Sequence, residues 1–98
     1  MMEELVEKIK QWGREHQINN VDKQALKCTE ELGEIISEIC HNRLDSEELK
    51  DGIGDTTVTL IILADILGFD YQECVQMAYD TIKKRTGKTL DGNFLKDQ

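Results

Sequence analysis

The alternation of apolar and polar residues along the chain predicts four helices joined by short links. Over about residues 2–15 an apolar residue recurs at every third or fourth position, as on one face of an amphipathic helix. The polar, turn-forming stretch 16–20 follows, and either Asn20 or Asp22 can cap a second helix. That helix carries one apolar stripe to about Cys40, formed by Ala25, Cys28, Leu32, Ile35, Ile36 and Ile39.

The third and fourth helices begin at capping signatures. Asp45-Ser-Glu-Glu48 and Asp70-Tyr-Gln-Glu73 both have the spacing of a capping box. The third helix is expected to end at Gly68, a natural C′ residue, and the fourth stops before Gly87. The last eleven residues, from Lys88, show no clear period and predict an extended tail over residues 88–98.

The third helix differs from the others because it is apolar on nearly every face between Val58 and Leu67. Such a helix is usually buried in a larger body, and 98 residues supply only three other helices to cover it. A chain of this length forms one domain with one core. We therefore expect an all-α fold: a single-domain four-helix bundle, residues 1–98, that is completed by homo-oligomerisation as a dimer or tetramer.

Charge and composition narrow the possible partners. A formal charge of −8 disfavours a nucleic acid polymer, and an anionic ligand would need a bridging cation. Three cysteines without C-x-x-C spacing suggest neither disulfides nor a zinc site, but a reducing compartment. The chain begins Met-Met-Glu-Glu, unlike a signal peptide, and its longest apolar run, Val58–Ala64, is too short to span a bilayer. We expect a cytoplasmic protein without a membrane partner.

Acidic residues line one face of the second helix. Glu31, Glu34 and Glu38 fall within one narrow sector because residues three and four apart share a helix face. These like charges repel one another, and only Lys27, one turn before Glu31, offers local relief. A bound cation would remove the conflict. For this helix taken alone, however, a solvated acidic face is the more common arrangement.

Two aspartates in the third helix favour a metal site. Asp51 and Asp55 lie four residues apart, and their line continues to the core positions Val58 and Ile62. An unpaired carboxylate that points into a bundle is costly unless it is paired or bound to a metal. If the second and third helices are antiparallel neighbours, the glutamates of one face the aspartates of the other. Ligands that offer only oxygen suit Mg²⁺, or Mn²⁺, rather than zinc.

Other residues leave two interpretations open. Gly52 and Gly54 indicate either close helix packing or room for a substrate. Trp12 can stack on a base, but its place in the apolar stripe of the first helix favours core packing. Asp65 interrupts the apolar run of the third helix and is either a group that supports the site or a solvent-exposed residue.

The acidic motifs resemble those of a known family. Glu30-Glu31-Leu32-Gly33-Glu34 is similar to the E-E-x-x-E signature of MazG-type nucleoside triphosphate pyrophosphohydrolases, and Asp51-Gly-Ile-Gly-Asp55 is similar to their second acidic motif. The likeness extends across the chain and is greatest to the short phage-type MazG-like proteins. The separated matches are Trp12 with Arg14, Gln24 with Lys27, Ile82–Lys88, Gly92–Phe94 and Lys96.

The resemblance implies an all-α fold and a Mg²⁺ site held by Glu31, Glu34 and Asp55. The second motif normally reads E-x-x-D, and Gly52 stands where its glutamate would be. Asp51, one turn before Asp55, can take that place through an i, i+4 arrangement. The expected metal ligands are therefore Glu31, Glu34, Asp51 and Asp55.

The resemblance also implies a reaction. Water attacks between the α and β phosphates of a nucleoside triphosphate and yields a nucleoside monophosphate and pyrophosphate. Glu34 is the first candidate to orient and deprotonate that water, followed by Glu30 and Glu38. The expected substrate-binding cations are Lys27, Lys83, Arg85 and Lys88. The last three lie near the end of a predicted helix, where cations also occur without any ligand.

Two rival functions are weighed against this one. Glu38-Ile-Cys-His41 is an E-x-x-H motif, and a carboxylate-bridged di-iron bundle needs two of them, which a homodimer could assemble. The motif occurs once per chain and its histidine lies at the end of the predicted helix, which disfavours this function. A non-catalytic helical oligomer that binds a nucleotide or acts in regulation is the stronger rival, and Gly52 favours it.

Overall fold

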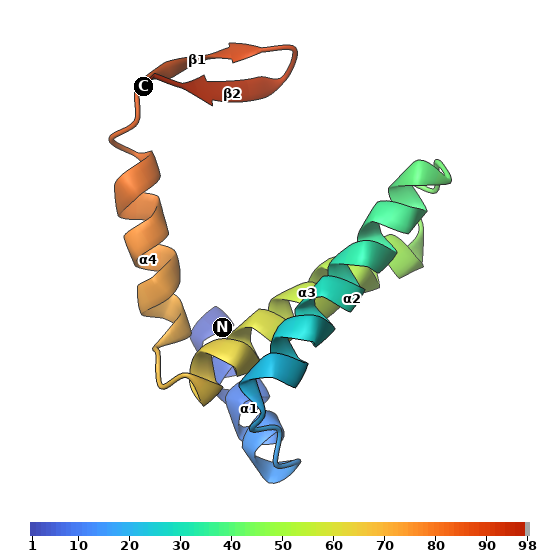
Figure 1. Ribbon diagram of the computed structural model, residues 1–98, viewed down its shortest axis with the longest axis vertical. Helices are drawn as coiled ribbons and strands as arrows, with labels where there is room; N and C mark the ends of the chain where they lie inside the picture. The colour runs from blue at the N-terminus through green and yellow to red at the C-terminus, as the bar shows by residue number, and fades with distance from the viewer. Residues whose placement is uncertain (98) are drawn as a thin grey trace.

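Four helices and a C-terminal β-hairpin make up the computed structural model, which describes residues 1–97 (Figure 1). The predicted mostly helical, four-helix fold is confirmed. The elements are α1 (Met2–Glu15), α2 (Val21–Cys40), α3 (Glu47–Ile66), α4 (Tyr71–Ile82), β1 (Gly87–Leu90) and β2 (Asn93–Lys96).

Side-chain caps fix where three of the helices begin. The Asn20 side chain accepts a hydrogen bond from a backbone N–H in the first turn of α2 (2.9 Å), so Asn20 rather than Asp22 is the cap. Ser46 and Asp70 accept equivalent bonds at the starts of α3 and α4. Gly68 follows α3 with a φ of 80°, the left-handed conformation expected of a C′ glycine.

The C-terminal residues, predicted as an extended tail over residues 88–98, form a β-hairpin over residues 87–96. β1 and β2 pair antiparallel, with Leu90 opposite Asn93. Between them Asp91 and Gly92 have φ values of 52° and 75°, the left-handed conformation that a two-residue hairpin turn requires. The two strands show no alternation of apolar and polar residues in the sequence. All of their residues are exposed, and neither face of the hairpin is apolar throughout. The Asp-Gly pair is the local signal for the turn.

The core forms where α1 crosses α3, beside the antiparallel α2–α3 pair (Figure 1). Ile61 is fully buried, and Ile62 of α3 and Val6 of α1 are each 3 % exposed. Gly13 allows the close approach of α1, because a Cβ at this position would lie 3.3 Å from the side chain of Ile62. Ile61 and Ile62 of α3 are thus covered within the chain, whereas Leu60 on the same helix stays 43 % exposed.

An ion pair between Arg14 and Asp65 joins α1 to α3. The Arg14 guanidinium donates two hydrogen bonds to the two Asp65 oxygens, at 2.7 and 2.9 Å. These bonds hold the pKa of the Asp65 carboxyl below its usual value. Asp65 therefore connects two helices, and neither of the two predicted interpretations describes it.

Trp12 is not a core residue, contrary to prediction. Its side chain is 48 % exposed, and the face of α1 that packs on α3 contains Val6 and Gly13 instead. Because glycine is not counted as apolar in a periodic stripe, the pattern of large residues assigned the wrong face of α1 to the core.

Only part of the apolar stripe predicted to bury α2 faces α3. Ile35 lies against Gly52, whereas Leu32, Ile36 and Ile39 are each about half exposed. The fully buried residues that α2 turns toward its neighbour are polar, namely Gln24 and Glu31. A large apolar surface on α2 is consequently left uncovered by the chain itself.

α4 leaves the other helices at a wide angle and carries the hairpin at its far end (Figure 1). It contains no buried residue; it lies beside the end of α3 and lines a cavity together with Met2, Glu3 and Val6 of α1. The radius of gyration is 15.9 Å, compared with about 13 Å for a compact chain of this length. This open shape agrees with the predicted homo-oligomer, which stays a prediction.

Within residues 1–97 no single helix is long and apolar enough to cross a membrane. By length and composition alone, α3 and α4 satisfy that criterion together, as a pair bent by 107°.

A matched pair of substitutions tests the packing of α2 on α3. A Cβ at Gly52 would lie 3.1 Å from Ile35 Cγ1, whereas a Cβ at Gly54 meets no neighbouring atom. We expect Gly52→Val to lower the free energy of unfolding by about 1–3 kcal/mol through overpacking. Gly54→Val should change it by less than about 1 kcal/mol. Urea denaturation followed by circular dichroism measures both, and equal effects would contradict the close approach.

Candidate functional site

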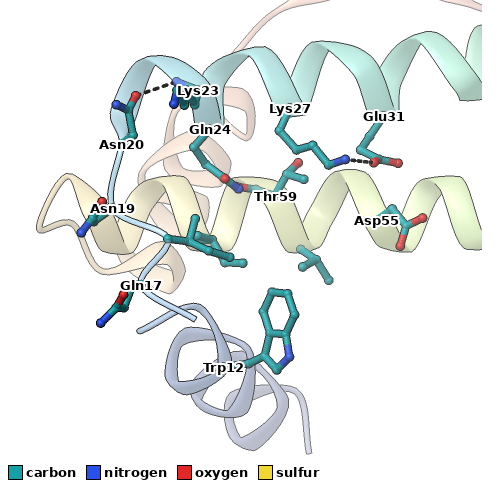
Figure 2. A pocket seen from close by; sticks show the side chains of 13 residues that line it. Trp12, Gln17, Asn19, Asn20, Lys23, Gln24, Lys27, Glu31, Asp55 and Thr59 are labelled. Carbon is teal, nitrogen blue, oxygen red and sulfur yellow. Dashed lines mark hydrogen bonds and ion pairs between the residues drawn. The ribbon is translucent and has the colours of Figure 1, made fainter. Parts of the chain in front are cut away.

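A cavity of about 580 Å³ lies where α1, residues 17–20, α2 and α3 meet (Figure 2). Trp12 projects into it from α1, and Glu31 and Asp55 lie together at one end. Amide side chains from the α1–α2 connection, including Gln17 and Asn19, lie at the opposite end. The cavity therefore has an acidic end and an opposite end that offers side-chain amides and one cation, Lys23.

The start of α2 sets which side chains reach this cavity. Because the helix begins after Asn20, residues Gln24, Lys27 and Glu31 fall on one face, three and four residues apart, and that face is turned to α3. The Gln24 amide donates a hydrogen bond to the backbone carbonyl of Thr59 at 3.1 Å, a buried contact that ties α2 to α3. This bond fixes the helix face that presents the acidic residues.

Glu31 is the buried carboxylate of the site. It is 8 % exposed, and one of its oxygens lies 3.5 Å from the Lys27 ammonium. The other oxygen, Oε2, is buried without a hydrogen-bond partner. A buried carboxylate oxygen normally has a partner, because leaving it unpaired costs free energy. The unpaired oxygen is therefore available to a ligand or a metal ion.

Glu34 and Asp55 experience the charge of Glu31. The pKa of Glu34 is raised, first by the Glu31 charge and then by burial, with a smaller contribution from Asp55. The pKa of Asp55 is raised by burial, and then by the charges of Asp51 and Glu31. These carboxylates repel one another, and Lys27 offsets the repulsion only in part. The arrangement favours a cation.

Asp51 occupies the edge of this group. Its side chain is exposed and faces a shallow depression that it shares with Glu47, Glu48 and Lys50. Gly52, which stands in the place of the expected glutamate, is buried against Ile35 of α2. Gly52 thus serves close helix packing, one of the two predicted interpretations. The open space at Gly54 leaves that residue without a packing reason.

The fit of the site to Mg²⁺ follows from its donors rather than from a preformed cage. Within residues 1–97, no three acidic, histidine or cysteine side chains are grouped closely enough to hold a metal ion. The site nevertheless offers oxygen donors alone, an unpaired buried oxygen on Glu31, and mutual repulsion that a cation would relieve. Glu31, Glu34 and Asp55 are the residues that could hold Mg²⁺, after rotation of their side chains.

Glu38 is engaged elsewhere. Its carboxylate accepts hydrogen bonds from Arg43 at 2.9 and 3.1 Å and from the Ser46 hydroxyl at 3.1 Å, and these bonds lower its pKa. It thereby connects the end of α2 to the residue that caps α3. His41 is bound through Nδ1 to a backbone carbonyl oxygen, at 2.7 Å. Glu38 and His41 therefore support the α2–α3 turn, and neither lines the cavity.

The other candidates divide into two groups. Lys27 lines the cavity, and Glu30 is exposed beside it, 3.7 Å from the Lys27 ammonium. Lys83, Arg85 and Lys88, by contrast, are exposed on the connection that follows α4 and on β1, and the structure does not bring them to the acidic residues of the cavity.

Sequence reasoning missed the half of the cavity that lies away from the acidic residues. Trp12, Gln17, Asn19 and Gln24 line it, yet none was predicted as a site residue. A signal existed in the 16–20 stretch, which is rich in side-chain amides as well as in turn formers. It pointed equally to an ordinary loop, because asparagine favours turns with or without a ligand.

Comparison with known proteins relates this geometry to a family. Residues 20–89 match the sequence model of the MazG nucleotide pyrophosphohydrolase domain. Over 66 residues the chain is 35 % identical to an uncharacterized 18.2 kDa protein in the rep-hol intergenic region of Haemophilus phage HP1. That alignment covers 64 % of this chain and 39 % of the phage protein, so the chain spans well under half of its relative's length. No solved structure matches the chain significantly.

Removal of one repelling charge should stabilise the metal-free protein. The raised pKa of Glu34 means that the folded state favours its protonated form, so its contribution to stability is present below about pH 4.3 and is lost as the pH rises through the folded pKa. We expect Glu34→Gln to be more stable than the wild type at pH 7 without divalent cations. Below about pH 4 the difference should disappear.

Thermal unfolding in a chelator at several pH values measures this difference. The matched control is Glu30→Gln on the same helix, which removes an exposed charge that lies beside Lys27 and should give no gain. Mg²⁺ should raise the melting temperature of the wild type more than that of Glu34→Gln, because binding to the folded state stabilises it. Loss of stability in metal-free Glu34→Gln would contradict the repulsion.

Proposed function

Because the chain belongs to the MazG nucleotide pyrophosphohydrolase family, we propose that it is a Mg²⁺-dependent nucleoside triphosphate pyrophosphohydrolase. The products are a nucleoside monophosphate and pyrophosphate. One observation carries the proposal: the cavity joins a buried carboxylate with an unpaired oxygen, Glu31, to an aromatic ring, Trp12. A nucleotide has the matching parts, since its phosphates bind a metal ion and its base can stack.

The two ends of the cavity suit the two ends of such a substrate. Trp12 offers a ring face on which a base can stack, and the amides of Gln17 and Asn19 offer hydrogen bonds to its edge. Glu31 and Asp55 hold the phosphate end through a shared cation. The substrate would therefore lie along the cavity, with its triphosphate toward α2 and α3.

Glu31, Glu34 and Asp55 are the proposed Mg²⁺ ligands, with Asp51 as a fourth from the edge of the group; Mn²⁺ has the same donor preference. When bound, the ion would offset the charge that develops on the leaving pyrophosphate. Lys27 is the one proposed phosphate-binding residue that lies in the cavity of its own chain. It now pairs with Glu31 and would be free to contact a phosphate once that carboxylate has another partner.

Glu34 is the proposed general base. It lies beside Glu31, and a carboxylate that is not fully used by a metal can orient and deprotonate water. Glu30 is the alternative, one turn away on the exposed side of α2. Glu38 is dropped from this role because its carboxylate binds Arg43 and Ser46.

Pyrophosphate release from a panel of ribo- and deoxynucleoside triphosphates, with and without Mg²⁺, tests the activity directly. We expect Mg²⁺-dependent release from at least one member. Glu34→Gln should lower kcat by about 10²-fold or more, within the range of lost general-base catalysis. If Glu30→Gln has the large effect and Glu34→Gln does not, the general base is Glu30. If the wild type binds a nucleotide but turns over no member of the panel, the pyrophosphohydrolase proposal is wrong.

Substitution of Trp12 separates binding from chemistry. Stacking on an aromatic side chain contributes roughly 1–3 kcal/mol per base. Trp12→Ala should therefore raise KM by about 5- to 150-fold and leave kcat within a few-fold of the wild type, since the ring lies away from the reacting phosphates. Trp12→Phe, which keeps a ring, is the matched control and should recover most of the affinity. A large fall in kcat alone would contradict the stacking role.

A non-catalytic nucleotide-binding or regulatory oligomer is the second candidate. The exposed Asp51 and the absence, within residues 1–97, of a preformed group of three ligands favour it. Calorimetric titration with a nucleotide and Mg²⁺, in parallel with the pyrophosphate assay, distinguishes the two functions. Binding without turnover supports the second.

A further inference from the structure

Within residues 1–97, the C-terminal arm, defined here as residues 71–96, meets the rest of its own chain only through α4, beside the end of α3 and the start of α1. α4 has no buried residue, and both strands of the hairpin are exposed along their whole length. The hairpin contacts none of the four helices within the described chain. A two-stranded hairpin alone in water is marginally stable at best. The arm therefore requires a surface that its own chain does not provide.

The charge of the arm's outer part is opposite to that of the remaining chain. Residues 83–96, the outer part of the arm, contain five of the 12 cations and one of the 20 acidic residues, a net charge of +4. Residues 1–70, which lie outside the arm, hold seven cations and 16 acids, a net charge of −9. Opposite potentials favour and orient association. The surface that the arm requires is thus one like the acidic body formed by residues 1–70.

The arm cannot reach the cavity of its own chain. The molecule is 45 Å long, and along this axis the hairpin lies at one end while the connection between α1 and α2, which lines the cavity, lies at the other (Figure 1). Lys83 pairs with Asp80 in its own helix at 3.0 Å, whereas Arg85 and Lys88 form no ion pair within residues 1–97. These cations are available to another molecule.

We propose that the arm of one copy lies on a second copy of this chain, and that Arg85, Lys88 and Lys83 enter the acidic end of that copy's cavity. Each site then consists of carboxylates from one subunit and cations from another. The assignment of those cations to substrate phosphates rests on the proposed function; the exchange of arms does not.

Exposed apolar residues identify a second copy as the partner. On α2, the half-exposed Leu32, Ile36 and Ile39 form a continuous stripe, and on α4, Val75 and Ile82 are also half exposed. Copies related by a two-fold axis would cover both surfaces at once and close the assembly. A lone chain of this shape leaves them in water, with a radius of gyration above that of a compact domain.

Complementation between two inactive variants tests the shared site. Glu31→Gln removes the buried carboxylate and keeps the arm, and the double variant Arg85→Ala/Lys88→Ala does the reverse. Each alone should lose most activity, while Lys88→Arg should keep it. An equal mixture, co-assembled by joint refolding, should recover about one quarter of wild-type activity, because about one site in four pairs an intact cavity with an intact arm. A mixture that forms hybrids but stays inactive would overturn the proposal.

A second measurement needs neither turnover nor a variant. ¹⁵N-labelled and unlabelled full-length protein are co-assembled and treated with a carbodiimide, which joins a lysine amine directly to a carboxylate. We expect peptides with Lys83 or Lys88 to be joined to peptides with Glu31, Glu34 or Asp55, and to carry mixed labels. The proposal is overturned if every link between the arm and the cavity carries a single label. It is also overturned if the reagent joins other lysines to carboxylates but forms no link between the arm and the cavity. A wild type that is inactive but gives mixed-label links would refute the enzymatic function and leave the arm exchange intact.

Discussion

The close packing of α2 against α3 is the constraint on which the candidate site depends. It requires a residue without a side chain at Gly52, opposite Ile35, and it is held by the buried hydrogen bond from Gln24 to the backbone of Thr59. Between these two contacts along the helix pair lies Glu31, buried with one oxygen unpaired. Had α2 turned its apolar stripe toward α3, Glu31 would face solvent and the cavity would have no acidic end.

This packing keeps an electrostatic conflict in the fold. The charge of Glu31, followed by burial, raises the pKa of Glu34, and burial, followed by the nearby carboxylates, raises the pKa of Asp55. A single lysine, Lys27, offsets part of the repulsion. Ion pairs elsewhere are well matched: Arg14 binds Asp65 across α1 and α3, and Arg43 binds Glu38 at the α2–α3 turn. The acids at the cavity lack sufficient partners, and a divalent cation with a bound phosphate group would supply what is missing.

The open shape of the chain adds a second constraint. Apolar residues on α2 and α4 lie in water, and a basic hairpin projects from an otherwise acidic molecule. Burial of apolar surface and attraction between opposite charges both favour association with another copy. The same association would bring cations to a cavity whose own chain supplies too few of them for a triphosphate.

The sequence by itself determined the helices, because periodicity, capping residues and a C′ glycine are local properties of the chain. It also identified the acidic residues of the site, since residues three and four apart share a helix face whatever the fold. It could not determine which face of α2 is buried: a stripe that contains Leu32, Ile36 and Ile39 can pack within the chain or against another copy. Only the tertiary structure decided this, through the Gly52–Ile35 approach, and placed Trp12 and Glu31 on one cavity. It also paired Arg14 with Asp65, 51 residues away along the chain. Such contacts depend on which surfaces of distant segments meet, and no local pattern contains that information.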